Sequence, residues 1–175
     1  MCLNYLHLNL NYFVGDKENV LSRFYHCAKQ YQLKSIVRIT SDNPLIDIEI
    51  IEKTISLFLQ GYDYVANNII KSFPHGLDVE VFSFNSLERS FIEAFEKSHT
   101  EHVTQYIRHN ENKFNITNYK SHKNYHDIRV TLDTEEDYNL LKKVVSIGGI
   151  LSLIHISEPT RPERIGDAGF WVKKK

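Results

Sequence analysis

Apolar side chains recur along this chain at two spacings, one typical of helices and the other typical of strands. Helical spacing follows Asp16, which we expect to cap a helix ending near Tyr31, and Asp47, which we expect to open a helix ending near Gly61. Strand-like runs occupy 35–39, 62–66, 78–82, 114–119 and 128–132. Strands that alternate with helices indicate an α/β fold, and the hairpin-like later strands indicate that its sheet is mixed.

Three further helices are predicted from their starting residues. One begins at Asn85 or Ser86. The other two carry the spacing of a capping box, in which a hydroxyl and a carboxylate three residues apart bond each other's backbone N–H: 98–101 and 134–137. We therefore expect one helix from about residue 98 to 107 and a final helix after Thr134.

Two carboxylates stand directly after strand-like runs. Asp42 lies in VRITSDNPLID (37–47), and Asp133 lies in IRVTLDTEEDY (128–138). Ligands in open α/β sheets bind at the carboxyl ends of strands, and one or two protein carboxylates are enough to hold a Mg²⁺ that bridges phosphate oxygens. The alternatives are local: an Asx turn at Asp42 before Pro44, and a helix cap at Asp133 shared with Thr134.

The run HGLDVEVFS (75–83) also carries candidate binding residues. Asp78 and Glu80 alternate along a predicted strand, so we expect both carboxylates on one face, where they can accept hydrogen bonds from sugar hydroxyls. A solvated strand face is the alternative. Asn67 and Asn68, after the strand at 62–66, are candidate substrate contacts, although turn formation is the more common use of asparagine there.

Three more candidates are basic or aromatic nitrogen groups. The run EHVTQYIR (101–108) places His102 at the first turn of a predicted helix and Arg108 near its end, and Arg129 lies on a predicted strand. Either arginine can neutralise a phosphate or a sugar carboxylate, because guanidinium pairs bidentately with both.

Taken together and in chain order (37–47, 75–83, 101–108 and 128–138), these four runs resemble the cytidylyltransferase family, which includes the spore-coat polysaccharide enzymes and the CMP-sugar synthetases. The resemblance covers 13–145 and implies a Rossmann-like nucleotide-diphospho-sugar transferase fold. It implies an enzyme that transfers CMP from CTP to a sugar acid or related sugar, releasing pyrophosphate, for cell-surface polysaccharide or glycan synthesis. Asp42 and Asp133 match the family's catalytic, Mg²⁺-holding acids. Gly76 matches the position where backbone approaches the ligand, and His102 matches a histidine that contacts the sugar.

The chain departs from the family pattern in several places. Ser41 replaces a glycine, Asn43 a cysteine and Glu135 a common proline, and these changes spare both carboxylates. The family's glycine-rich GSxRLPGK-like loop is absent. We therefore expect 1–150 to be a partial nucleotidyltransferase domain that lacks its N-terminal βα units, on the order of 60 residues, and that binds nucleotide poorly. The alternative is a non-catalytic sugar- or nucleotide-binding module of the same fold.

The last 25 residues differ in character from the rest. From Leu151 the chain reads LSLIHISEPTR, which resembles a translated sequencing adapter, and it ends in three lysines. We therefore expect 151–175 to be an artificial tail and assign it no function.

Composition narrows the class of protein further. The 175 residues suit one domain, and a net charge of −1 without a basic block argues against nucleic-acid binding. Two cysteines without metal-ligand spacing indicate a reduced, cytoplasmic setting, and no apolar stretch has the length of a membrane span. A homodimer is an expectation from the family resemblance.

Overall fold

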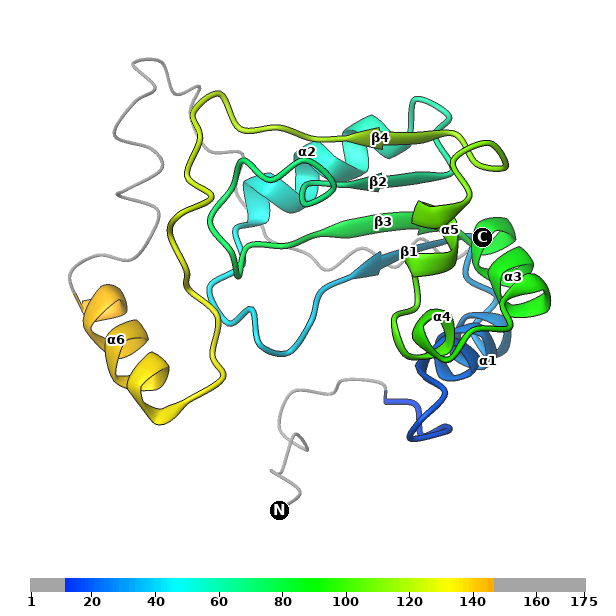
Figure 1. Ribbon diagram of the computed structural model, residues 1–175, viewed down its shortest axis with the longest axis horizontal. Coiled ribbons are helices and arrows are strands. Elements are labelled where there is room, and N and C mark those ends of the chain that lie inside the picture. The colour runs from blue at the N-terminus through cyan, green and yellow to red at the C-terminus, as the bar shows by residue number, and fades with distance from the viewer. Residues whose placement is uncertain (1–11, 147–175) are drawn as a thin grey trace.

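A four-stranded mixed sheet lies at the centre of the computed structural model, which describes residues 12–146 (Figure 1). Its strands, in spatial order, are β1 (Ser35–Arg38), β3 (Glu80–Ser83), β2 (Tyr64–Ala66) and β4 (Ile116–Asn118). Strand β3 is antiparallel to β1 and to β2, whereas β4 is parallel to β2. The prediction of an α/β fold with a mixed sheet is confirmed.

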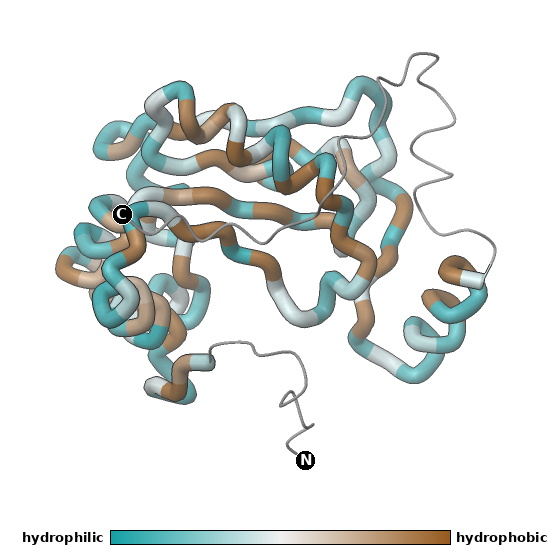
Figure 2. Tube along the Cα trace, turned by 180° about the vertical axis from the view of Figure 1, so that it is seen from behind, coloured by the Kyte–Doolittle hydropathy of each residue, from teal (hydrophilic) through white to brown (hydrophobic). Residues whose placement is uncertain are grey.

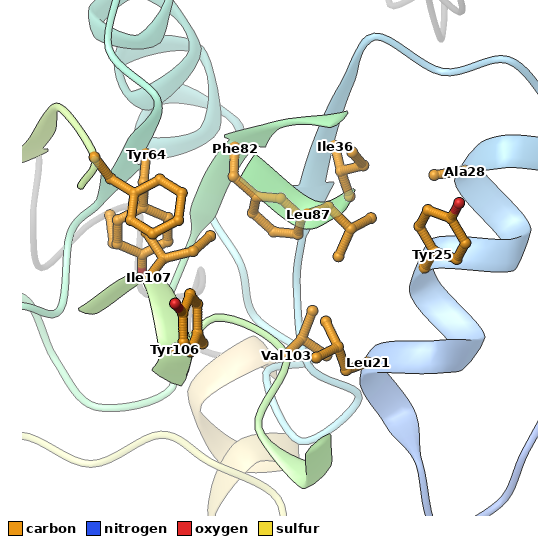
Figure 3. Close-up of a cluster of buried hydrophobic side chains, with 12 residues drawn as sticks. Leu21, Tyr25, Ala28, Ile36, Tyr64, Phe82, Leu87, Val103, Tyr106 and Ile107 are labelled. Carbon is orange, nitrogen blue, oxygen red and sulfur yellow. The ribbon is translucent and has the colours of Figure 1, made fainter. Parts of the chain in front are cut away.

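One face of the sheet is covered by α1 (Val20–Gln30), α3 (Phe84–Glu93) and α5 (Gln105–His109). The short helix α4 (Lys97–Glu101) packs against α1 and α5. Figure 3 shows the apolar cluster that results, with Leu87 of α3 beside Phe82 of β3 and Leu21 of α1 beside Val103. These side chains are at most 1% exposed, so each contributes about 1.5–3 kcal/mol by leaving water. This cluster fixes how α5 lies over the sheet.

The opposite face packs against α2 (Ile48–Phe58) and α6 (Glu135–Ser146). Val79 and Val81 belong to this second cluster, while Phe82 belongs to the first, because successive residues of a strand point to opposite faces. Figure 2 shows the matching hydropathy, with apolar segments gathered along the strands. Burial on both faces explains why 77–82 reads as a nearly continuous apolar run interrupted by two carboxylates.

Helix starts were predicted with mixed success. Asp47 caps α2 through a bond from the Glu49 backbone N–H, as predicted. The capping box at 134–137 is confirmed, because each residue accepts a bond from the other's backbone N–H. The cap at Asp16 is wrong: Asn19 caps α1, and Asp16 stabilises the turn before it.

The predictions for 85–86 and 98–107 were also inexact. Ser83 caps α3, which begins at Phe84, one or two residues earlier than expected. The single helix expected over 98–107 is divided into α4 and α5 by a turn, and α4 begins after Glu96 without a side-chain cap. The turn lets Val103 enter the core at 0% exposure, so burial of this side chain overrides the continuous helical pattern.

The predicted strand at 128–132 is wrong, since only an isolated parallel bridge joins His75 to Arg129. Even so, backbone bonds from His75 N to Ile128 O and from Val130 N to His75 O hold the segment beside 74–77. Gly76 has a φ of +108°, and a Cβ there would lie 2.7 Å from Thr131 N. Glycine is therefore required at this crossing for packing reasons alone.

The expected artificial tail, 151–175, and the first eleven residues lie outside the described part of the chain. Within 12–146, no helix is both long enough and apolar enough to cross a membrane.

Candidate functional site

Polar side chains gather where β1 and β2 end and β3 begins. The strand register sets Arg38 and Ala66 on either side of Glu80, so the residues that follow β2 lie at the same edge. Two hollows open there and share Asn68 and Arg108. The first, about 180 Å³, is lined by Asn67, Asn68, Lys71, Phe73, His75, Asp78 and Arg108. The second, about 340 Å³, is lined by Arg38, Asn68, Glu80, His102, Thr104, Gln105, Arg108 and His109.

Glu80 is the most enclosed charged group of this region, with 3% exposure. Its Oε1 accepts bonds from the Tyr64 hydroxyl at 2.6 Å, the Thr104 hydroxyl at 2.6 Å and Arg108 Nη2 at 3.0 Å, and its Oε2 accepts one from Arg38. Burial by itself would raise the pKa of Glu80, but the two guanidinium groups outweigh it and lower that pKa below its usual range. Glu80 is therefore ionised at neutral pH, and its oxygens already have four protein donors.

Arg108 lines both hollows, and its predicted binding role stays a prediction. Its Nε donates to the Tyr64 hydroxyl at 2.7 Å, and its Nη2 donates to the Asn68 side-chain oxygen and to Glu80. The guanidinium also lies over the Tyr64 ring, 5.6 Å from the centroid. These contacts hold the charge of Arg108 in a fixed place between the two hollows.

Asp78 differs from Glu80 although only one residue separates them. It is half-buried in the first hollow, where burial raises its pKa above the usual range despite the nearby His75 and a hydrogen bond with Asn68. Among residues 12–146 no arginine forms a hydrogen bond or salt bridge with its carboxylate. Its oxygens therefore remain more open to a ligand than those of Glu80, and Asp78 is the better placed of the two for accepting a hydroxyl.

Asn67 and Asn68, at the end of β2, have different structural positions. Asn67 is 1% exposed, and its amide bonds the backbone at Leu77 O (2.7 Å) and Val79 N (2.9 Å), so it fixes the segment that leads into β3. Asn68 faces both hollows. Substrate binding by Asn67 stays a prediction, and its neighbour is the more accessible amide.

Asp42 and Asp133 lie on neighbouring segments, because Leu132 N donates to Asp42 O at 2.9 Å. Asp42 Oδ1 is buried and has no hydrogen-bond partner among residues 12–146. The Asp42 side chain thus makes no Asx turn there. Asp133 is not the cap of α6, a place that Thr134 takes, and its Oδ2 accepts from Arg129 Nη2 at 2.5 Å and from Thr131 at 3.1 Å.

The structure therefore separates the predicted residues into two groups. Asp78, Glu80, His102, Arg108 and Asn67 line the hollows, whereas Arg129 pairs with Asp133. Gly76 lies next to His75 and packs on the 130–131 backbone. The binding roles of these residues stay predictions.

Seven lining residues were missed from the sequence: Arg38, Lys71, Phe73, His75, Thr104, Gln105 and His109. Arg38 is the last residue of β1, so the strand-end rule that selected Asp42 applies to it equally. Gln105 Oε1 is buried without a hydrogen-bond partner in the described residues. Nothing in the sequence pattern distinguishes Lys71 or Thr104 from surface and turn residues.

The donor set at Asp42 fits a hard cation. Among residues 12–146 no three or more His, Cys, Asp or Glu side chains group as metal ligands. Mg²⁺ does not need such a cage, because it keeps several waters and is commonly held by one or two carboxylates together with substrate phosphates. The unpartnered, buried Oδ1 of Asp42, beside the Asp133 segment, suits such a partial ligand set.

Comparisons with known proteins agree on one family. A family model described as Cytidylyltransferase matches residues 2–158. The uncharacterized protein MJ1063 of Methanocaldococcus jannaschii is 42% identical over 137 residues, which is 76% of this chain and 55% of that protein. The spore coat polysaccharide biosynthesis protein SpsF of Bacillus subtilis is 32% identical over 168 residues, 89% of this chain and 69% of that protein.

A solved structure agrees with the sequence comparisons. The structure of a cytidylyltransferase from Leptospira borgpetersenii superposes with a TM-score of 0.78 at 30% identity, covering 81% of this chain and 61% of that one. The chain thus spans about three fifths of the length of MJ1063 and of the solved relative.

Proposed function

Since this chain belongs to the cytidylyltransferase family, we propose that the whole protein transfers a cytidylyl group from CTP to a sugar and releases pyrophosphate. In this reaction a sugar hydroxyl oxygen bonds to the α-phosphorus. The bond from that phosphorus to its bridging oxygen breaks, and pyrophosphate and the hydroxyl proton leave. The whole protein's activity is a proposal because the chain spans only 55% of MJ1063 and 61% of the solved relative.

One observation supports nucleotidyl transfer most directly: Asp42 Oδ1 is buried, unpartnered within 12–146, and next to the Asp133 segment. Burying a carboxylate oxygen without a partner is unfavourable unless a ligand supplies one. We assign Asp42 and Asp133 to Mg²⁺, which would neutralise the crowded phosphate oxygens when bound. Arg129, bonded to Asp133, orients that carboxylate.

We assign the sugar to the two hollows. Asp78 would accept a hydrogen bond from a sugar hydroxyl, and His102 and the Asn68 amide would add polar contacts. The substrate class we propose is a sugar acid or a related sugar, because the shared wall of the hollows contains Arg108. A role in surface polysaccharide synthesis is suggested by the name of SpsF, which concerns that protein. The cytoplasmic location and the homodimer stay predictions.

The test is an assay of pyrophosphate release by the whole protein with CTP, Mg²⁺ and a panel of sugar acids and neutral sugars. We expect transfer from CTP in preference to other nucleotides. Asp42→Asn should lower kcat by about 100-fold or more, since it removes a charged ligand of the metal. Asp127→Asn is the matched control, because that carboxylate is 90% exposed and pairs, within residues 12–146, only with His126.

Transfer that persists unchanged in excess chelator, or an Asp42→Asn variant as active as Asp127→Asn, would contradict the proposed role of these residues. For the 175-residue chain by itself we propose a second candidate function, because it contains no GSxRLPGK-like run. That function is sugar or nucleotide binding without transfer. Saturable sugar binding by the chain, without pyrophosphate release, would favour it.

A further inference from the structure

The second hollow is lined by two arginines and one glutamate. Arg38 and Arg108 both pair with Glu80, and the remaining lining side chains are two amides, one hydroxyl and two imidazoles. Glu80 is ionised, because the arginines lower its pKa. Within this hollow two positive charges therefore face one negative charge. The other carboxylate that acts on Arg108, Asp78, belongs to the first hollow.

The same two arginines also have N–H donors that form no hydrogen bond within residues 12–146. Arg38 uses only Nη1, and Arg108 uses Nε and Nη2. This leaves Arg38 Nε and Nη2 and Arg108 Nη1 without hydrogen-bond partners in the described residues. The two side chains are 20% and 30% exposed, so these donors are accessible from the hollow. A guanidinium presents its donors in a rigid fork that matches carboxylate and phosphate geometry.

The buried hydrogen bonds of Glu80 hold this arrangement in place. Tyr64 and Thr104 donate to Oε1 alongside Arg108, which leaves Oε2 to Arg38. Glu80 itself is only 3% exposed and has four donors, so it is poorly placed to bind a sugar hydroxyl. Its contacts instead fix the positions of two guanidinium groups that belong to different elements, β1 and α5.

We propose that Arg38 and Arg108 form a binding site for one oxyanion group of the substrate, a carboxylate or a phosphate, and that Glu80 is the positioning residue that preorganises them. A hollow of about 340 Å³ has room for such a group with part of the molecule that carries it. The identity of that molecule rests on the proposed function. The binding site itself can be measured without turnover.

The test is NMR of the arginine Nε–H groups in the full 175-residue chain, titrated separately with inorganic phosphate and with glucuronate. We expect saturable shifts at Arg38 and Arg108 and none at Arg89, which pairs with Glu93 away from the hollows. Saturation by phosphate alone would identify a phosphate as the bound group. Saturation by glucuronate, alone or more tightly, would identify a sugar carboxylate. Equal, unsaturated shifts at all arginines would mean an adventitious ion only and would overturn the proposal, as would no shift.

Glu80→Gln tests the positioning role, because a pure charge effect and a positioning effect predict opposite changes in the affinity for the anion. If only net charge mattered, removing a negative charge would tighten anion binding. If Glu80 positions the arginines, the amide cannot hold Arg38, and the affinity should fall by about tenfold. Affinity that is unchanged or higher would overturn the positioning role.

Arg38→Lys covers the outcome in which Glu80→Gln fails to fold. It keeps the charge and three of the four contacts of Glu80 but loses the guanidinium fork, so affinity should again fall by about tenfold. Arg89→Lys is the matched control and should bind like the wild type. The anion titration contains no CTP, so it is independent of the transfer assay. A whole protein without transferase activity would not contradict anion binding at Arg38 and Arg108, and a chain without anion binding would not contradict transfer from CTP.

Discussion

At the scale of single residues, Asp78 and Glu80 show that sequence spacing does not determine chemical state. Both were expected to accept sugar hydroxyls from one strand face. In the structure the pKa of Asp78 is raised, chiefly by burial, and that of Glu80 is lowered, because two arginines outweigh its burial. The arginines come from residues 38 and 108, which are distant in the sequence, so neither their proximity nor the division of roles was predictable from the HGLDVEVFS run.

Asp78→Asn should increase stability while it impairs function. A carboxyl whose pKa is raised on folding favours the folded state below its unfolded pKa and loses that contribution as pH rises through the folded value. Asparagine resembles the protonated form. The variant should therefore unfold at a higher temperature than the wild type at pH 7, and the difference should vanish near pH 3, in thermal denaturation followed by circular dichroism.

The Asp78→Asn protein should also bind or transfer sugar less well, because the open acceptor in the first hollow is gone. Asp127→Asn, at an exposed position, controls for the loss of one charge. An Asp78→Asn protein less stable than this control at pH 7 would show that the carboxylate stabilises the fold, contrary to the shift of its pKa.

At the scale of elements, the capping and periodicity rules were reliable where the neighbouring contacts are local. The caps of α2 and α6 were found because Asp47 and Thr134 bond backbone within three residues. The division of α4 from α5 was missed, since it depends on burying Val103 against side chains distant in sequence. The segment at 128–132 was read as a strand because it is β-branched and apolar, yet it meets 74–77 at a single bridge.

The crossing of 128–132 with the segment before β3 predicts unequal effects for two glycines. Gly76 and Gly61 both have positive φ, +108° and +103°, but a Cβ at Gly76 would meet backbone at 2.7 Å, and a Cβ at Gly61 would meet nothing within 4 Å. Gly61→Ala should lower the free energy of unfolding by about 1 kcal/mol from backbone strain alone. Gly76→Ala should lower it by about 3 kcal/mol, because the 130–131 backbone must also move.

Urea denaturation of the two variants measures this difference, with the m-value expected to stay unchanged. Equal losses would mean that the 128–132 segment moves aside without cost. In that case the position of Asp133 beside Asp42 would be loosely held, and the bond from Leu132 N to Asp42 O would matter less for the predicted metal site.

At the scale of the whole molecule, the family and the mixed sheet were predictable because four ordered sequence runs carry them, and the family comparison bears this out. The paired hollows were not predictable as a unit. They form where the ends of β1 and β2 meet α5, and only the three-dimensional arrangement brings Arg38, Asn68 and Arg108 together. A single sequence shows which strand ends are polar but not which of them share a wall.

Several carboxylates spread over the molecule have lowered pKa values, which predicts acid sensitivity of the whole fold. The pKa of Glu93 falls from 4.5 to about 2 through hydrogen bonds from Lys113, Tyr106 and Arg89, and those of Asp16 and Asp137 are lowered by backbone N–H donors. A group with a lowered folded-state pKa stabilises the protein above its unfolded pKa, and that contribution is lost as pH falls through the folded value. For Glu93 the window runs from pH 4.5 down to about 2.

Glu93→Gln measures the contribution of Glu93 to this loss of stability at low pH. The variant should be less stable than the wild type at pH 7, and the gap should close between pH 4.5 and about 2, where wild-type Glu93 itself becomes protonated. Because Glu93 lies at the surface, added salt should narrow the gap at pH 7. Glu111→Gln, at an exposed turn after α5, is the matched control. Urea unfolding at a series of pH values measures both variants, and a Glu93→Gln deficit that stays constant from pH 7 to pH 2 would show that its contribution is packing of the side chain, with no part due to charge.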